Sequence, residues 1–287
     1  MSIELKKISK RFVDNVVLDG VDFFVAEGET VALLGPSGVG KSVLLKHIIG
    51  LIKPDSGEVW VDGQLVPLLG RKELSELRSR IGYVFQNGAL FDSMDVFENI
   101  RLGITDEHQY ADKDYCMQRV KECLRLVNLN EDVGGKLPSE LSGGMRKRVG
   151  IARAIAGKPV YLLYDEPTSG LDPVNADIID SLIERLQQEI GVTSVVVTHD
   201  VRGAFRVADR IALLAQAKIR AVGTAEEIIA SKDPVVQQFL ERDLEMAVIQ
   251  AGALTFQTPA SRRSSGGFGA IGGAGGAGGA GGAGGAS

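Results

Sequence analysis

Residues 35–42 read Gly35-Pro36-Ser37-Gly38-Val39-Gly40-Lys41-Ser42. The spacing, in which four residues separate a glycine from Gly-Lys-Ser, is typical of a loop that binds phosphates. The loop follows an apolar run at residues 31–34 and precedes a helical pattern, which is the context that phosphate binding requires. Backbone N–H groups of such a loop can face a triphosphate, and the dipole at the helix start favours negative charge. An ordinary glycine turn is the alternative interpretation, and the strand and helix context disfavours it.

The loop also predicts which atoms hold the phosphates. The Lys41 ammonium should reach the β- and γ-phosphates, and the Ser42 hydroxyl should bind Mg²⁺. The predicted nucleotide-binding residues of this segment are Gly35, Pro36, Ser37, Gly38, Val39, Gly40, Lys41, Ser42 and Val43.

Two further apolar runs, at residues 160–165 and 194–199, also end in polar residues. Continuous apolar strands are typical of a parallel sheet that is covered on both faces. A helical pattern follows each run, most clearly after Asp172-Pro173, which is a good pair for a cap and a first turn. This alternation predicts an α/β fold. The alternating pattern of the first 30 residues and the strand-like residues 58–63 predict a small antiparallel sheet beside the parallel one.

The middle and the end of the chain differ from this core. Between about residues 88 and 156 the pattern becomes helical, which predicts an inserted α-helical subdomain. Beyond about residue 252 the chain becomes rich in glycine and has few apolar side chains to bury, which predicts a disordered tail. The expected division is a folded domain at residues 1–245 and a flexible Gly/Ala-rich tail at residues 246–287.

Composition argues against several classes of protein. The chain has 287 residues and a net charge of −5, which disfavours a broad basic surface for nucleic acid or anionic lipid. Its longest apolar runs fall far short of the roughly 18 residues of a spanning helix. The N-terminus lacks the apolar region of a secretory signal. Two cysteines, Cys116 and Cys123, cannot form a disulfide framework, so a reducing cytoplasm is the expected location.

Two carboxylates and a histidine follow the predicted strands. Asp165 ends one apolar run and Glu166 follows it, and His199 ends the next run. Ligands of open α/β sheets bind at the carboxyl ends of the strands. We therefore expect Asp165 to hold Mg²⁺ through water and Glu166 to act as a general base. A solvated turn for the acidic pair and a structural hydrogen bond for the histidine are the alternatives.

The segment Leu141-Ser142-Gly143-Gly144-Met145 completes a set of motifs. With the phosphate loop, Gln86, Asp165-Glu166, residues 169–172 and His199, it resembles the motif set of the ABC ATPases, in order, over about residues 3–245. The resemblance implies a RecA-like parallel-sheet core with a small antiparallel subdomain and an inserted helical subdomain. It also implies an enzyme that binds ATP with Mg²⁺ and hydrolyses it to ADP and phosphate.

Residues 141–145 resemble the family's signature motif. The same resemblance implies that two copies of the chain pair head to tail, so that the signature of one closes over the phosphates bound by the other. Ser142, Gly143 and Gly144 open a helix, and their N–H groups and hydroxyl would form a second cradle for the γ-phosphate. A helix cap is the simpler role of this segment, and both roles are compatible. Asp172 would belong to the loop that crosses the dimer.

Three further roles follow from the resemblance. Phe12 takes the position of the aromatic ring that stacks on adenine, although a core position is the usual role of a phenylalanine. Gln86 would contact Mg²⁺ or the attacking water, and His199 would hold the γ-phosphate. Met145 stands where many relatives have glutamine, and the basic triplet at residues 146–148 follows it. We predict that neither touches the chemistry and that the triplet is a solvated helix face, with contact to a partner as the alternative.

A transporter role requires a separate permease, because no membrane segment is expected. In the family, permease helices dock in a groove near the segment after the glutamine. Phe91, Met94 and Phe97 could line such a groove or could equally belong to the core of the helical subdomain. Residues 87–97, and residues 233–239 after the last core helix, are similar to the ATPases of Mce-type (Mla-type) lipid transporters.

This narrower resemblance implies the ATPase subunit of a transporter that moves phospholipid or other hydrophobic molecules across the bacterial envelope. The implied partners are a second copy of the chain, an integral permease, Mce-domain substrate-binding subunits and a small cytoplasmic regulator. The implied location is peripheral, at the cytoplasmic face of the inner membrane, and no nucleic acid is involved. The alternative within transport is an importer ATPase for amino acids or another small polar solute. A soluble ABC machine acting on DNA or ribosomes needs a longer chain. Retention of Glu166 and His199 disfavours a module that binds nucleotide without hydrolysis.

Overall fold

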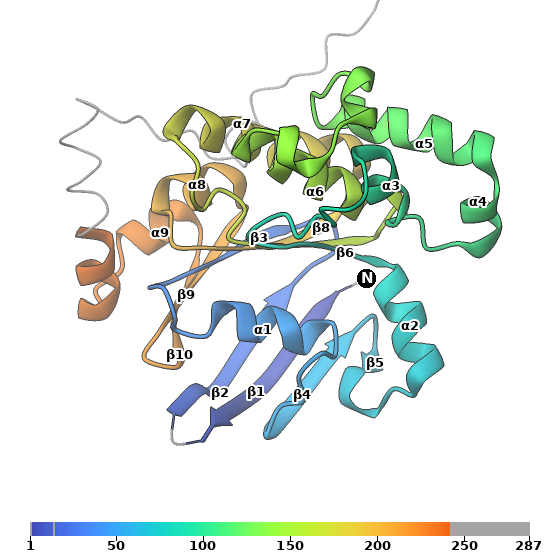
Figure 1. Cartoon of the computed structure of the whole chain (residues 1–287). Coiled ribbons are helices and arrows are strands. Elements are labelled where there is room, and N and C mark those ends of the chain that lie inside the picture. The colour runs from blue at the N-terminus through green and yellow to red at the C-terminus, as the bar shows by residue number, and fades with distance from the viewer. Residues whose placement is uncertain (1, 14, 242–287) are drawn as a thin grey trace, which may run out of the picture.

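The structure is a computed structural model that describes residues 2–13 and 15–241 (Figure 1). Its centre is a six-stranded sheet. The strands are β3 (Thr30–Leu34), β6 (Ile81–Val84), β7 (Tyr161–Asp165), β8 (Thr193–Thr198), β9 (Arg210–Ala215) and β10 (Lys218–Gly223). Their order is β10-β9-β3-β8-β7-β6, in which β10 is antiparallel to β9 and the other pairs are parallel.

The strands of this sheet send alternate side chains to two covered faces. Val31 and Leu33 point to the face that α1 (Lys41–Ile48) covers, whereas Leu34 packs with α8 (Val201–Val207) and α9 (Ala225–Ile229) on the other face. Figure 1 shows α1 below the sheet and α6, α7 and α8 above it. Burial on both faces explains why these strands are apolar throughout. The predicted α/β fold with a parallel core is confirmed.

A second, four-stranded antiparallel sheet lies on the α1 side of the core. It consists of β1 (Ile3–Phe12), β2 (Asn15–Val25), β4 (Ser56–Val61) and β5 (Gln64–Leu65), in the order β2-β1-β4-β5. Leu5 pairs with Phe23 on one side and with Val59 on the other, and all three are buried. They join the same apolar cluster as α1, which fixes this sheet against the core. The predicted small antiparallel sheet is confirmed.

Helices form the opposite side of the molecule (Figure 1). They are α3 (Val96–Arg101), α4 (Glu107–Ala111), α5 (Lys113–Leu126), α6 (Gly143–Ala156) and α7 (Pro173–Ile190), and α2 (Arg71–Ser79) precedes β6. Short 3-10 turns lie at Val66–Leu68, Glu131–Gly135 and Pro138–Glu140. Val120 and Leu124 of α5 pack with Ile151 and Ile155 of α6. The division at residue 245 stays a prediction, and the tail predicted at residues 246–287 lies outside the described residues.

Membrane-spanning segments were not expected from the sequence. Within residues 2–13 and 15–241, every helix is too short or too polar to cross a bilayer.

Candidate nucleotide-binding site

Parallel pairing brings three strand ends to one edge of the large sheet. Leu34, the last residue of β3, pairs with Thr198 of β8, and Asp165, the last residue of β7, pairs with Val197. The phosphate loop begins directly after Leu34, and His199 comes directly after Thr198. The phosphate loop, Asp165 and His199 therefore lie at the same edge, although well over 100 residues separate the loop from either side chain in the sequence.

The phosphate loop needs glycine at its first and sixth positions. The φ angles of Gly35 and Gly40 are 158° and 114°, which residues with a Cβ rarely adopt. A Cβ on Gly35 would lie 2.2 Å from the Leu214 carbonyl oxygen, and one on Gly40 would lie 2.5 Å from Cγ1 of Val17. Neighbouring atoms of Leu214 and Val17 therefore leave no room for a side chain at either position. Among the other loop residues, the exposed ones are Pro36, Ser37 and Gly38, and the half-buried ones are Val39 and Val43.

The Asp165 carboxylate accepts hydrogen bonds from two hydroxyl groups. Ser42 Oγ donates to Oδ1 over 2.6 Å, and the Tyr83 hydroxyl donates to Oδ2 over 2.9 Å. Burial, reinforced by the charge on Asp165, raises the pKa of Tyr83, which therefore stays a proton donor. A hydroxyl and a carboxylate in contact form the oxygen donor set that Mg²⁺ prefers, with phosphate oxygens and water as its remaining ligands. The donor chemistry at Ser42 and Asp165 therefore fits the predicted metal site.

Glu166 lies between a lysine and a histidine. Lys41 Nζ is 3.2 Å from Oε1, and His199 Nδ1 is 2.7 Å from Oε2. Lys41 also donates to the carbonyls of Gly35 (2.7 Å) and Pro36 (3.0 Å). Burial lowers the pKa of Lys41, and the Glu166 carboxylate counteracts that effect. A buried carboxylate that contacts the phosphate-loop lysine is well placed to accept a proton beside bound phosphates.

The signature residues lie at the start of α6. Ser142 caps this helix by accepting the Met145 N–H over 3.3 Å, and both Ser142 and Gly143 are exposed. Gly144 is buried, and a Cβ there would lie 2.5 Å from Oδ1 of Asn175 on α7. This close approach joins the two helix starts. Asp172 caps α7 and accepts from the N–H and the side-chain amide of Asn175, over 3.1 and 2.6 Å.

The signature and Asp172 do not join the phosphate loop within one chain. In the described part of the chain, no hydrogen bond or ion pair links Ser142, Gly143, Gly144 or Asp172 to residues 35–42. Gln86 is exposed, and its side-chain amide donates to Ser169 Oγ over 3.3 Å. Phe12 is 43% exposed at the end of β1, where Lys10 Nζ lies 5.4 Å from its ring centre. An exposed ring at a strand end is available for stacking, which a core phenylalanine would not be.

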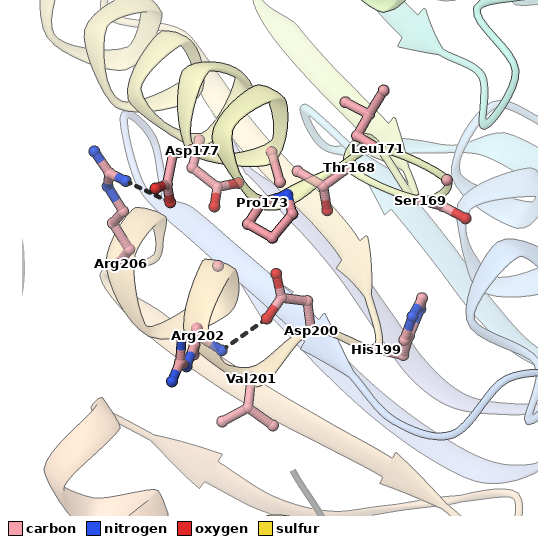
Figure 2. Close-up of a pocket in the computed structure, with 14 residues that line it drawn as sticks. Thr168, Ser169, Leu171, Pro173, Asp177, His199, Asp200, Val201, Arg202 and Arg206 are labelled. Atoms are coloured by element: carbon pink, nitrogen blue, oxygen red, sulfur yellow. Dashed lines mark hydrogen bonds and ion pairs between the residues drawn. The ribbon is translucent and has the colours of Figure 1, made fainter. Parts of the chain in front are cut away.

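A pocket adjoins His199 at the starts of α7 and α8 (Figure 2). Figure 2 shows Thr168, Ser169, Leu171 and Pro173 along one side and His199 and Asp200 along the other. Asp180 also lines the pocket and is 6% exposed.

Asp180 and Asp200 lie close together in this pocket. A Cβ on Gly203 would lie 3.0 Å from Oδ2 of both carboxyl groups. Burial, together with the charge of Asp200, raises the pKa of Asp180 to about 7. Asp180 therefore titrates near neutral pH, a property that no sequence motif indicated.

One sequence prediction about the signature helix is wrong. The basic triplet at residues 146–148 was expected to be solvated, and Arg146 is exposed, but Lys147 is only 6% exposed. Its Nζ donates to the carbonyls of Gln86 and Glu166, the latter over 3.2 Å. The prediction rested on the charge of the triplet alone, whereas α6 directs the side chain of Lys147 toward the interior. The helical spacing from Lys147 to buried Ile151, four residues later, was the signal that could have found it.

Two other features of the site had no sequence prediction. Tyr83 contacts Asp165 as described above, and Arg153 of α6 donates to the carbonyls of Gly88 (2.9 Å) and Ala89 (2.7 Å) in the segment after Gln86. Tyr83 lies in β6 and belongs to no recognised motif. Only the pairing of β6 with β7 brings it to Asp165.

Phe91 and Phe97 differ in burial. Phe91 is 54% exposed, whereas Phe97 packs against the helical core, as the second interpretation predicted. Met94 is half-buried. The docking groove stays a prediction.

Comparison with known proteins gives the family. A family model described as "ABC transporter" matches residues 18–169, just over half of the chain. The chain is 39% identical over 258 residues to the "Intermembrane phospholipid transport system ATP-binding protein MlaF" of Haemophilus influenzae, covering 90% of this chain and 95% of that protein. It is 40% identical over 240 residues to the "Probable ribonucleotide transport ATP-binding protein mkl" of Mycobacterium leprae, covering 84% and 69%.

A solved structure shares the fold. It is described as the "Dimeric structure of a post-hydrolysis state of the ATP-binding cassette MJ0796 bound to ADP and Pi". The similarity has a TM-score of 0.71 and 34% identity, and it covers 78% of this chain and 98% of that chain. Since the family model spans more than half of the sequence and a 39% identical relative spans nine-tenths of it, this chain belongs to the ABC transporter family.

Proposed function

We propose that this chain is the ATP-hydrolysing subunit of an ABC transporter that moves phospholipids or related hydrophobic molecules across the bacterial envelope through a separate permease. The observation that carries the hydrolytic part is the position of Glu166, whose carboxylate contacts both Lys41 and His199. The transport part rests on the MlaF relative, which matches nearly its whole length. The mkl relative carries a different transport name and leaves about a third of its length unmatched.

The residues have distinct tasks in hydrolysis. Backbone N–H groups within residues 37–43 and the Lys41 ammonium bind the triphosphate of ATP. Ser42, Asp165 and Gln86 would hold Mg²⁺, which neutralises phosphate charge when it is bound. Glu166 accepts a proton from the attacking water, and His199 orients the γ-phosphate.

Binding of nucleotide also prepares the base. Lys41 must leave Glu166 to reach the phosphates, and the freed carboxylate can then accept the proton of the water. Phe12 stacks on the adenine ring, for which its exposed position at the end of β1 is suited. Lys41 and Glu166 therefore respond to bound nucleotide and also take part in its hydrolysis.

The site is completed by a second copy of the chain in a head-to-tail dimer. Exposure of Ser142, Gly143 and Asp172 supports this arrangement, because these helix starts present N–H groups and a carboxylate to a partner. The dimeric description of the MJ0796 cassette supports it further. Each of the two sites then combines the phosphate loop of one copy with the signature of the other.

The subunit acts at the cytoplasmic face of the inner membrane, where it couples ATP hydrolysis to an integral permease. Phe85 and Phe91, 43% and 54% accessible, flank Gln86 in the sequence and are exposed apolar side chains that a permease helix can contact. Mce-domain subunits and a small cytoplasmic regulator are the further partners of the proposed complex.

Purification of the chain with its membrane partner tests the transport proposal. Mass spectrometry of the complex should find bound phospholipid, and phospholipid vesicles should stimulate ATP hydrolysis by the reconstituted complex. A complex without lipid whose hydrolysis responds only to ribonucleotides or amino acids would replace the lipid assignment. ATP hydrolysis by the complex would still support the enzymatic part.

A further inference from the structure

Lys147 is a buried cation on the helix that carries the signature residues. It lies on α6, five residues after the cap Ser142, and only 6% of it is exposed. A lysine buried to this extent normally has specific partners, because its ammonium loses the hydrogen bonds of water. The partners of Lys147 are therefore informative.

Both partners of Lys147 are backbone carbonyls of proposed catalytic residues. The Nζ atom donates to the carbonyl of Gln86, two residues after β6, and to the carbonyl of Glu166, directly after β7 and 3.2 Å away. These two carbonyls come from loops that are 80 residues apart in the sequence. One ammonium thus joins the signature helix to both loops.

Glu166 needs such support because its backbone is strained. Its φ angle is +50°, in the left-handed region that residues with a Cβ rarely adopt. The Glu166 N–H donates to the Val197 carbonyl over 2.9 Å, and the Ser169 N–H donates to the Glu166 carbonyl over 3.2 Å. Lys147 adds the contact from α6. Residues keep strained backbone angles only where the surrounding structure holds them.

Arg153, a second cation of α6 that contacts the loop after Gln86, does not support Glu166 in this way. Arg153 donates to the carbonyls of Gly88 and Ala89, so it holds the loop after Gln86 and makes no hydrogen bond to residue 166 among the described residues. Lys147 differs because it ties the loop to the carboxyl end of β7.

We propose that Lys147 is a positioning residue for hydrolysis: its ammonium holds the backbones of Gln86 and Glu166 in register with the signature helix and so sets the direction of the Glu166 carboxylate. The proposal rests on the assignment of Glu166 as the base. Within the described part of the chain, Lys147 makes no hydrogen bond to residues 35–43. Its loss should therefore change the rate of hydrolysis much more than the affinity for ATP.

Three variants of the full-length chain test this role. Lys147→Met removes the ammonium and keeps a similar volume, Lys147→Arg keeps a cationic donor, and Arg146→Met removes the exposed neighbouring cation as a matched control. For each, kcat and KM for ATP hydrolysis are measured, with ATP affinity from equilibrium binding. Misplacing a reacting group by about 1 Å costs up to about 100-fold in rate, so the methionine variant should lose about 10- to 100-fold in kcat. Its KM and ATP affinity should stay within about twofold, because residues 35–43 keep their contacts.

The arginine variant separates positioning from packing. Arginine should restore much of kcat because it can donate to both carbonyls, whereas a packing role favours methionine, which is closer to lysine in size. If the Lys147→Met variant does not fold, a Lys147→Gln variant takes its place in this comparison. The kcat of the arginine variant should again exceed that of the glutamine variant. A methionine variant with parental kcat, or one more active than the arginine variant, would overturn the proposal.

A Glu166→Gln variant, assayed in parallel, keeps the two proposals apart. If it hydrolyses ATP at the parental rate, the assignment of the base fails, and the role of Lys147 fails with it. If it is inactive while Lys147→Met is fully active, only the role of Lys147 fails.

Discussion

The Nζ atom of Lys41 lies 3.2 Å from Oε1 of Glu166, and both side chains are largely buried. Each group therefore compensates the charge of the other where water is scarce. Because Lys41 is also the residue expected to bind phosphates, we expect bound nucleotide to draw it away from Glu166. We therefore expect occupancy of the phosphate loop to release the proposed base.

Glu166→Gln should abolish hydrolysis without loss of ATP binding. Removing a general base typically costs about 10²- to 10⁴-fold in rate. ATP affinity should equal or exceed that of the parent, because a neutral amide competes less with phosphate for Lys41. Hydrolysis assays, equilibrium ATP binding and gel filtration check this, and the ATP-loaded variant should elute as a closed dimer. Glu76→Gln, at an exposed carboxylate on α2, is the control and should behave as the parent.

Phe12→Ala should weaken ATP binding through loss of stacking on adenine. Stacking of a base on an aromatic side chain is worth about 1–3 kcal/mol, or about 5- to 150-fold in affinity. Phe24→Ala removes a ring of similar exposure, 46% against 43%, from the neighbouring strand and should leave affinity unchanged. Equal ATP affinity of the parent and Phe12→Ala in isothermal titration would remove Phe12 from the nucleotide site.

Tyr83→Phe should raise the Mg²⁺ concentration needed for hydrolysis. The variant deletes the donor 2.9 Å from Oδ2 of Asp165, and loss of such a supporting hydrogen bond typically weakens a metal site by about 10- to 100-fold. The measurement is the hydrolysis rate as a function of Mg²⁺ at saturating ATP. Tyr161→Phe, which removes a hydroxyl bonded to Asp62, is the matched control. Equal Mg²⁺ curves for the two variants would show that Tyr83 does not support the metal site.

Asp180 should make stability depend on pH below neutrality. Its pKa is raised to about 7 in the folded chain, from an ordinary value of 3.8, so the folded state keeps a proton that the unfolded state has released. The free energy of unfolding should therefore fall as the pH rises from about 4 to about 7, by at most about 4 kcal/mol from this residue.

Asp180→Asn keeps a neutral side chain at every pH and should flatten this part of the curve. Urea unfolding at about pH 5 and about pH 8 checks the effect, with Asp177→Asn, at an exposed carboxylate of the same helix, as control. A parental curve and an Asp180→Asn curve of the same slope would contradict the prediction.

Local patterns sufficed for much of the fold. The phosphate loop, the apolar runs and the helix start at Asp172-Pro173 depend on neighbours in the sequence, and the structure confirms the elements that they predicted. The predicted roles of Ser142, Gly143, Gly144 and Asp172 across a dimer stay predictions, because they concern contacts between copies. Those of Phe12 and Gln86 stay predictions because they concern bound nucleotide.

Contacts between distant segments required the tertiary structure. Tyr83 meets Asp165 only because β6 pairs with β7, and Lys147 is buried only because α6 turns that side toward Gln86 and Glu166. Phe91 and Phe97, six residues apart, face solvent and core respectively.

The sequence by itself determined which chemistry this chain carries, because a turn that needs glycine and a strand that needs apolar side chains are specified within a few residues. Only the tertiary structure decided which groups meet, since strand order and helix rotation depend on packing over the whole domain. The partners of Glu166 and Asp165 belong to that second class.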